Sequence, residues 1–228
     1  MDDPEQQKLD ALAEFAAGAG HEINNPLAII GGRAQLLLKE IEHPEHRRQL
    51  GVIVAQVKRA YEMIADIRFF ARPPRPELVA FNLVEELQTL TTEQMPMMSE
   101  TGVEFHVNID PAIDAMVHSD PVLLHVAVAA LCSNAREALQ PASGTVWLTL
   151  RREIDCWEII VQDNGLGVSE EIRPLIFDPY FSGRQAGRGL GFGLPKAWQI
   201  MQLLGGTIRY EQPDAGCGSA FVLTLPAS

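Results

Sequence analysis

The sequence predicts an α+β protein with an N-terminal helical hairpin followed by a two-layer α/β sandwich, in which helices cover one face of a mixed sheet. Three observations support this prediction. Apolar residues recur at spacings of three and four over most of residues 6–70, the period of an amphipathic helix. Three prolines then stand within residues 73–76. Beyond residue 81, short strand-like segments alternate with helical ones, as in helices packed on a sheet.

Residues 1–72 are expected to form the hairpin. One helix is predicted from about Gln6 to Lys39 and a second from about Pro44 to Phe70, because His43-Pro44-Glu45 interrupts the apolar pattern. An isolated helix pair exposes half of its apolar stripe, so we expect two copies to form a dimeric four-helix bundle. Pro26 lacks a backbone donor, and we expect a bend where it stands.

Residues 73–80 are expected to be a stiff proline-rich linker, and residues 81–228 a second domain. A capping Asp120 and an early Pro121 mark one of the helices of this domain. We predict helices at 83–99, 121–139 and 194–204, and strands at 103–109, 115–118, 145–152, 157–162, 207–211 and 219–225.

Composition excludes several classes of function. The chain has 228 residues, a net charge of −12 and a pI near 4.9, so we expect no nucleic-acid partner. The three cysteines, Cys132, Cys156 and Cys217, are far apart and odd in number, and they show neither a disulfide framework nor a zinc pattern. No apolar run approaches the ~18 residues of a membrane span. We expect a cytoplasmic chain, which could be the cytosolic part of a longer sensor protein.

His21 and Glu22 are adjacent in the run Gly20–Leu27, inside a predicted helix and just before Pro26. A histidine beside a carboxylate is unusual on a coiled-coil surface. The pair is explained if the imidazole is a nucleophile, in which case another part of the chain must supply an electrophile.

Two motifs of the second domain contain residues suited to a nucleotide. Asn134 lies in a predicted helix, and its amide oxygen is a ligand that Mg²⁺ accepts. Asp163 ends a predicted strand, where a carboxylate can accept a hydrogen bond from an exocyclic amine such as that of adenine. A plain Asp-Asn-Gly turn is an equally open interpretation. Gly165 and Gly167 then allow the backbone to turn sharply.

Two further motifs follow. Phe177 belongs to an aromatic segment that could pack a loop against the domain, and the guanidinium groups of Arg184 and Arg188 could bind phosphate oxygens. Alternating glycines then lead into a helix N-terminus, where backbone amides and the helix dipole favour anions. This last motif runs from Gly187 to Leu194 and includes Gly189, Gly191 and Gly193.

Together and in this order, the motifs resemble those of the histidine protein kinases of two-component signalling, over about residues 9–225. The run His21–Leu27 is similar to that family's H box. Asn134, residues 163–167, Phe177 and residues 189–193 are similar to its N, G1, F and G2 boxes. The resemblance implies a dimerisation and histidine phosphotransfer hairpin, followed by a Bergerat-type ATP-binding domain as in gyrase, Hsp90 and MutL proteins.

The resemblance also implies individual roles. His21 would accept the phosphoryl group, and Glu22 would take its proton or hold the reactive imidazole tautomer. Asn134 would bind Mg²⁺ and Asp163 the adenine amine. ATP and Mg²⁺ would be the cofactors, and the partners would be a second copy of the chain and a response-regulator receiver domain. The adenine pocket, lid and phosphate loop would comprise Gly165, Gly167, Phe177, Arg184, Arg188, Gly189, Gly191, Gly193 and Leu194.

Two positions leave alternatives open. Asn25 lies four residues after His21, on the same face of the predicted helix, where related kinases place a polar residue that orients water for dephosphorylating the regulator. It could equally help the backbone around Pro26. Ala130 stands where the family usually has a second asparagine, and a methyl group cannot bind Mg²⁺. A non-catalytic or weakly active nucleotide-binding scaffold is therefore the alternative function.

Overall fold

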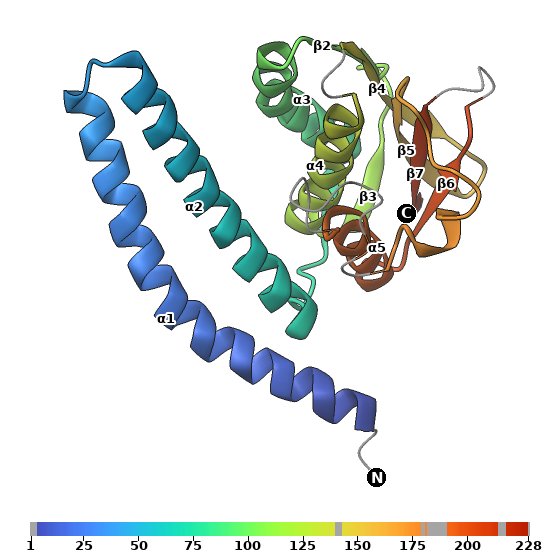
Figure 1. Ribbon diagram of the computed structural model, residues 1–228. Helices are drawn as coiled ribbons and strands as arrows, with labels where there is room; N and C mark the ends of the chain where they lie inside the picture. The colour runs from blue at the N-terminus through green and yellow to red at the C-terminus, as the bar shows by residue number, and fades with distance from the viewer. Residues whose placement is uncertain (1–3, 140–142, 179–180, 182–190, 214–217, 228) are drawn as a thin grey trace. The chain divides into compact units, whose positions relative to one another are not determined.

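The computed structural model describes residues 4–139, 143–178, 181, 191–213 and 218–227, and only the backbone of residues 4–21 and 71. Tertiary contacts divide the chain into two compact units, Met1–Pro74 and Arg75–Ser228. The predicted fold class is confirmed, because a helical hairpin is followed by a mixed sheet with helices (Figure 1).

The first unit consists of α1 (Pro4–Glu40) and α2 (Pro44–Ala71). The helices approach closely at Gly31, where an added Cβ would lie 3.1 Å from Cγ1 of Val57. At the turn, the guanidinium of Arg47 donates to the carbonyl oxygens of Leu38 and Ile41, which stabilises the end of α1. Helix α1 contains Pro26 without interruption, and its ribbon curves along its length (Figure 1).

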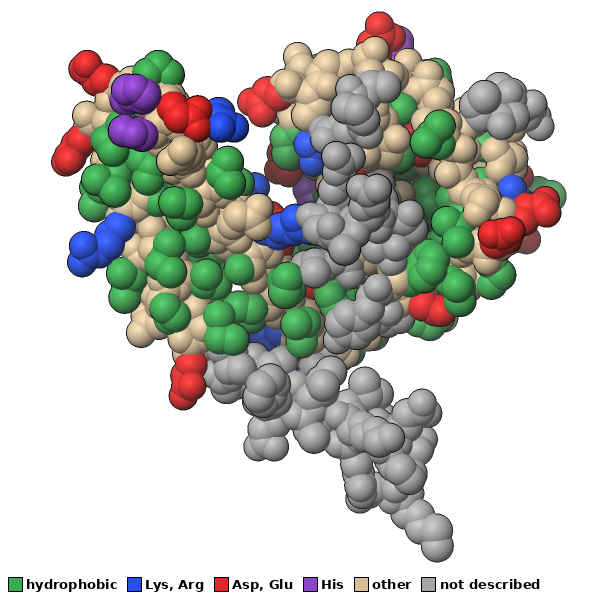
Figure 2. Space-filling model, viewed as in Figure 1, with side chains coloured by type: hydrophobic (Ala, Val, Ile, Leu, Met, Phe, Trp, Pro, Cys, Tyr) green, Lys and Arg blue, Asp and Glu red, His purple; other side chains and the backbone are tan. Residues whose placement is uncertain are grey.

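Much of the apolar surface of the hairpin remains exposed. Several large aliphatic side chains on both helices are 42–60% exposed, and Figure 2 shows hydrophobic side chains gathered along this unit. An apolar surface of this kind is typical of a protein interface, which supports the expected dimerisation. These side chains are Ile23, Ile29, Ile30, Leu36, Leu37, Val52 and Ile53.

The second unit has a five-stranded sheet in the order β2-β4-β5-β7-β6 and a two-stranded sheet of β1 and β3. The β2–β4 pair is parallel and the other pairs are antiparallel. Helices α3, α4 and α5 lie on one side of the larger sheet (Figure 1). The elements are β1 (Val79–Asn82), α3 (Leu83–Glu100), β2 (Val103–Asn108), β3 (Met116–Ser119), α4 (Pro121–Ala138), β4 (Gly144–Arg152), β5 (Cys156–Asp163), the short 3₁₀ turn Arg173–Leu175, α5 (Gly193–Leu203), β6 (Thr207–Glu211) and β7 (Ser219–Pro226).

Strand β1 is absent from the sequence prediction, which assigned Val79 and Ala80 to the linker. The structure pairs these residues with Ser119 and His118 of β3. The four residues of β1 are two exposed ones followed by two half-buried ones, so they show no period-two alternation, and the strand's partner lies far along the chain. The linker therefore ends earlier than residue 80.

Polar side chains connect α3, α4 and the segment before β1. The carboxylate of Asp120, which is 6% exposed, accepts from the backbone N–H of Leu123 at 3.0 Å and from that of Glu77 at 2.8 Å. One side chain thus caps α4 and holds the segment before β1. Between α3 and α4, the ring nitrogens of His125 lie 2.7 Å and 3.0 Å from carboxylate oxygens of Glu86 and Glu93.

Candidate functional site

Asp163 lies at the end of β5, on the sheet face that packs against helices. Val161 and Ile159, at alternate positions of the same strand, are buried, and strand periodicity places Asp163 on their side. Its side chain is 1% exposed, and its Oδ1 accepts from the backbone N–H of Gly165 at 2.8 Å. The fold therefore buries a carboxylate where a strand gives way to a turn.

The turn after Asp163 requires glycine at two positions where other atoms of the chain come close to the backbone. A Cβ on Gly165 would lie 2.9 Å from Oδ1 of Asp163 and 3.2 Å from the carbonyl oxygen of Ala138, the last residue of α4. Gly167 has a φ of +74°, and its Cβ would lie 2.7 Å from the carbonyl oxygen of Gly218. Larger residues would close this space. The predicted adenine-pocket residues Asp163, Gly165 and Gly167 are thus brought together.

Two residues that sequence reasoning did not select complete this turn. Asn164 accepts from the backbone N–H of Thr145 at 2.8 Å through its Oδ1, which ties the turn to β4. Gly218 has a φ of +94°, and an added Cβ would collide with the carbonyl oxygen of Asp163. The glycine before a last strand was a visible signal, but its contact with Asp163 depends on the antiparallel pairing of β5 with β7.

The segment after Gly167 is fastened to the sheet beyond it. Arg173 donates to the carbonyl oxygen of Val168 at 3.2 Å and to Oε1 of Gln212 at 3.0 Å, with its guanidinium carbon 5.4 Å from the ring centre of Tyr210. Phe177 meets the buried ring of Phe221 edge-on, with ring centres 6.4 Å apart. The expectation that an aromatic residue packs this segment against the domain is met by Phe177.

The glycine motif leads directly into α5. Gly191 has a φ of +69°, and an added Cβ would collide with the backbone of Phe181. Gly193 and Leu194 form the first turn of α5, and a Cβ on Gly193 would lie 4.0 Å from the carbonyl oxygen of Ala130. The N-terminus of α5 therefore lies beside α4 one turn before Asn134, which is half-buried. Arg184, Arg188 and Gly189 lie outside the described residues.

In the first unit, His21 lies in α1, and its side chain is outside the described part of the structure. Glu22 and Asn25 are exposed, whereas Asn24 between them is half-buried. The turn that follows the histidine therefore presents a carboxylate and an amide on its open side.

The residues around Asp163 fit an adenine nucleotide. The glycines leave room that any Cβ would fill, and the buried carboxylate of Asp163 is an acceptor suited to an exocyclic amine. For Mg²⁺, Asn134 offers an amide oxygen and Ala130 offers none. Mg²⁺ keeps several of its waters and binds phosphate oxygens, so a single protein ligand is compatible with this ion. The described residues contain no group of three or more His, Cys, Asp or Glu side chains arranged for a metal.

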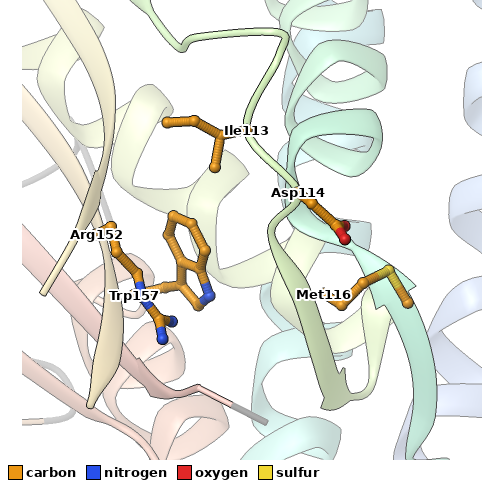
Figure 3. Close-up of a pocket in the computed structure, with 5 residues that line it drawn as sticks. All are labelled: Ile113, Asp114, Met116, Arg152 and Trp157. Atoms are coloured by element: carbon orange, nitrogen blue, oxygen red, sulfur yellow. The ribbon is translucent and has the colours of Figure 1, made fainter. Parts of the chain in front are cut away.

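A second hollow lies at the opposite end of β5. It has a volume of about 450 Å³ and is lined by Ile113, Asp114, Met116, Arg152 and Trp157 (Figure 3). The guanidinium carbon of Arg152 lies 4.7 Å from the ring centre of Trp157, which is 3% exposed. Because Trp157 lies at the start of β5 and Asp163 at its end, the hollow is not part of the site around Asp163.

Family comparisons agree with the geometry of both units. Residues 11–75 match the His Kinase A (phospho-acceptor) domain, and residues 119–228 match the histidine kinase-, DNA gyrase B- and HSP90-like ATPase domain. The chain belongs to the sensor histidine kinases of two-component systems. The two matches place His21 in the phospho-acceptor domain and Asp163 in the ATPase domain of that family.

Relatives in this family align with nearly the whole chain. It is 28% identical to the signal transduction histidine-protein kinase AtoS of Escherichia coli over 96% of this chain and 36% of the relative. It is 30% identical to sporulation kinase D of Bacillus subtilis over 98% of this chain and 44% of the relative. It is also 30% identical to the autoinducer 2 sensor kinase/phosphatase LuxQ of Vibrio vulnificus, over 97% of this chain and 27% of the relative. The chain therefore spans half or less of these relatives.

Solved structures share the fold. Full-length ShkA in complex with AMPPNP matches with a TM-score of 0.75 and 22% identity, over 94% of this chain and 46% of that one. The histidine kinase ThkA in complex with the response regulator TrrA matches with a TM-score of 0.70 and 23% identity, over 99% of this chain and 64% of that one. Among the described residues, no helix is both long enough and apolar enough to cross a membrane.

Proposed function

We propose that the chain is an ATP-dependent protein histidine kinase that phosphorylates His21 and passes the phosphoryl group to an aspartate on a response-regulator receiver domain. This proposal rests on one observation: the same chain contains a phospho-acceptor helix in its first unit and a buried Asp163 in a glycine-lined turn in its second. The core acts as a homodimer. Because its phosphoryl donor is ATP, it acts on the cytoplasmic side of the membrane.

The second unit binds and orients the nucleotide. Asp163 accepts from the adenine amine while the N–H of Gly165 holds its Oδ1 in place. Gly191 and Gly193 keep side chains away from the N-terminus of α5, where free backbone N–H groups stabilise phosphate. Arg184 and Arg188 are proposed phosphate contacts. When bound, ATP supplies the electrophilic phosphorus, and Mg²⁺, held by Asn134, offsets phosphate charge.

The first unit supplies the nucleophile. A neutral imidazole attacks through an unprotonated ring nitrogen, so the proton on His21 must be removed or kept on the other nitrogen. Glu22 is the adjacent, exposed carboxylate in the same turn, and it performs this task as a base or as the partner that sets the tautomer.

Labelling with γ-³²P-ATP and Mg²⁺ tests the proposal. The chain should acquire acid-labile, base-stable label, whereas His21→Gln should acquire none and still bind an ATP analogue. Asp163→Asn should lose both analogue binding and label. If the parent chain binds the analogue but takes no label with Mg²⁺ or Mn²⁺, it is the nucleotide-binding scaffold, and Ala130 is then the first residue to replace with asparagine.

Removal of phosphate from the regulator is a second candidate activity. Asn25 is exposed one turn after His21, where its amide can orient an attacking water, and the relative LuxQ is named a kinase/phosphatase. An Asn25→Ala chain should acquire label at His21 normally. It should dephosphorylate the regulator at least tenfold more slowly, which corresponds to an activation barrier higher by about 1.4 kcal/mol. Full phosphatase activity in this variant would refute the phosphatase role of Asn25 and favour its alternative role, supporting the backbone around Pro26.

A further inference from the structure

The turn of α1 that follows His21 lacks one backbone hydrogen bond. Pro26 has no N–H, so the carbonyl oxygen of Glu22, four residues earlier, has no donor at the usual helical position. Helices bend and open where such a bond is missing. The backbone carrying Glu22, and His21 directly before it, is therefore held less firmly by α1 alone than the rest of the helix.

Helix α2 makes a specific contact with this turn. The hydroxyl of Tyr61 donates to the main-chain carbonyl oxygen of Asn24 at 3.0 Å, across 37 residues of sequence and in a partly buried setting. Asn24 lies midway between Glu22 and Pro26. It also lies three residues after His21, about 4.5 Å along a helix axis. The contact joins α2 to the centre of the turn that lacks its own hydrogen bond.

The side chain of Asn24 leaves a polar atom unpaired in this turn. Its side-chain Oδ1 is buried without a hydrogen-bond partner among the described residues, and a buried unpaired acceptor lowers stability. One turn earlier on α2, Val57 packs against Gly31 by apolar contact. At the turn nearest the histidine, the specific contact between the helices is instead the polar one from Tyr61 to Asn24.

We infer that Tyr61 is a positioning residue for the reaction at His21: its hydroxyl restrains the proline-weakened turn of α1 and so sets the direction in which the histidine and Glu22 are presented. This inference rests on the proposed kinase function. Tyr61 belongs to the first unit, whereas the nucleotide site is formed by residues of the second unit, so its effect belongs to the transfer step rather than to ATP binding.

The test replaces Tyr61 with phenylalanine, which keeps the ring and removes the hydroxyl. The kcat for labelling of His21 should fall about fivefold, the rate equivalent of one neutral hydrogen bond, with KM for ATP unchanged. In a Pro26→Ala background, where the backbone N–H is restored, Tyr61→Phe should lower kcat by less than about twofold, because the two positions are coupled.

Val57→Ala is the matched control. It removes buried packing from the same helix pair and should lower the melting temperature at least as much as Tyr61→Phe, with a smaller loss of kcat. An equal loss of kcat in both variants, or the same fivefold loss with and without Pro26, would show that Tyr61 acts only through hairpin stability and would overturn the inference.

Amide hydrogen exchange separates this inference from the kinase proposal. Exchange in a peptide covering residues 21–28 should be faster in Tyr61→Phe than in the parent or in Val57→Ala, whether or not the chain takes phosphate from ATP. An unchanged exchange rate in Tyr61→Phe would refute the positioning role even if labelling succeeds. An unlabelled parent chain with faster exchange in Tyr61→Phe would refute the kinase proposal and retain the restraint.

Discussion

Replacing Gly165 with alanine should weaken nucleotide binding without unfolding the second unit. A Cβ at this position would lie 2.9 Å from Oδ1 of Asp163, and an ordinary contact begins near 3.4 Å, so one of the two must move by 0.5 Å. The other close neighbour, 3.2 Å away, is the main-chain oxygen of Ala138, which the end of α4 holds in place. The carboxylate of Asp163 is therefore the group that moves.

This movement has a definite cost. Gly165 has no positive φ, so alanine adds no backbone strain, and the loss falls on the 2.8 Å hydrogen bond from the Gly165 N–H to Asp163. A hydrogen bond to a charged group contributes about 1.5–3 kcal/mol. If about half of that is lost from the orientation of the carboxylate, the Kd for an ATP analogue should rise roughly tenfold.

Isothermal titration with a non-hydrolysable ATP analogue measures the effect, and thermal melting of the free protein measures stability. The melting temperature of Gly165→Ala should fall by only about 2–4 °C, the change expected for 1 kcal/mol in a domain of this size. Gly102→Ala is the control. Gly102 has a φ of +70° and open space around it, so its replacement should lower stability and leave affinity unchanged.

Two results would refute this reasoning. Analogue affinity within twofold of the parent would mean that the position of the Asp163 carboxylate does not govern binding. An equal loss of affinity in Gly102→Ala would mean that affinity follows overall stability rather than the geometry of the turn.

Three further outcomes are expected. Gly51→Ala, in α2 with nothing within 4 Å of the added Cβ, should raise the free energy of unfolding by about 0.5–1 kcal/mol in a urea titration; a loss would show that this position is covered in the dimer. Burial raises the pKa of Glu158, but hydrogen bonds from Arg151 and Arg209 outweigh it, and the net pKa lies below the ordinary 4.5. Glu158→Gln should therefore cost about 1 kcal/mol above pH 4.5, as for a partly exposed ion pair, and the difference from the parent should vanish as pH falls through the lowered pKa. Burial raises the pKa of the Cys132 thiol to about 12, so iodoacetamide at pH 8 should modify Cys132 only after unfolding, as peptide mass spectrometry would show.

Sequence periodicity predicted the elements that are long and amphipathic. The two hairpin helices and α3 begin and end within two residues of expectation, because each shows an apolar face over several turns. Strand β1 was missed because its four residues gain their structure from β3 rather than from a pattern of their own. The same limit applies to Gly218, whose role depends on a strand pairing.

The sequence by itself determined which chemistry is available, since a histidine beside a carboxylate, an aspartate at a strand end and alternating glycines are local patterns that can be recognised without a fold. The tertiary structure alone decided which of these groups meet. The pairing of β5 with β7 places Gly218 behind Asp163, and packing of α4 places Ala138 beside Gly165. The antiparallel hairpin brings Tyr61 to Asn24 across 37 residues. These contacts join residues far apart in the chain, and their closeness results from burial of the core, which no local pattern records.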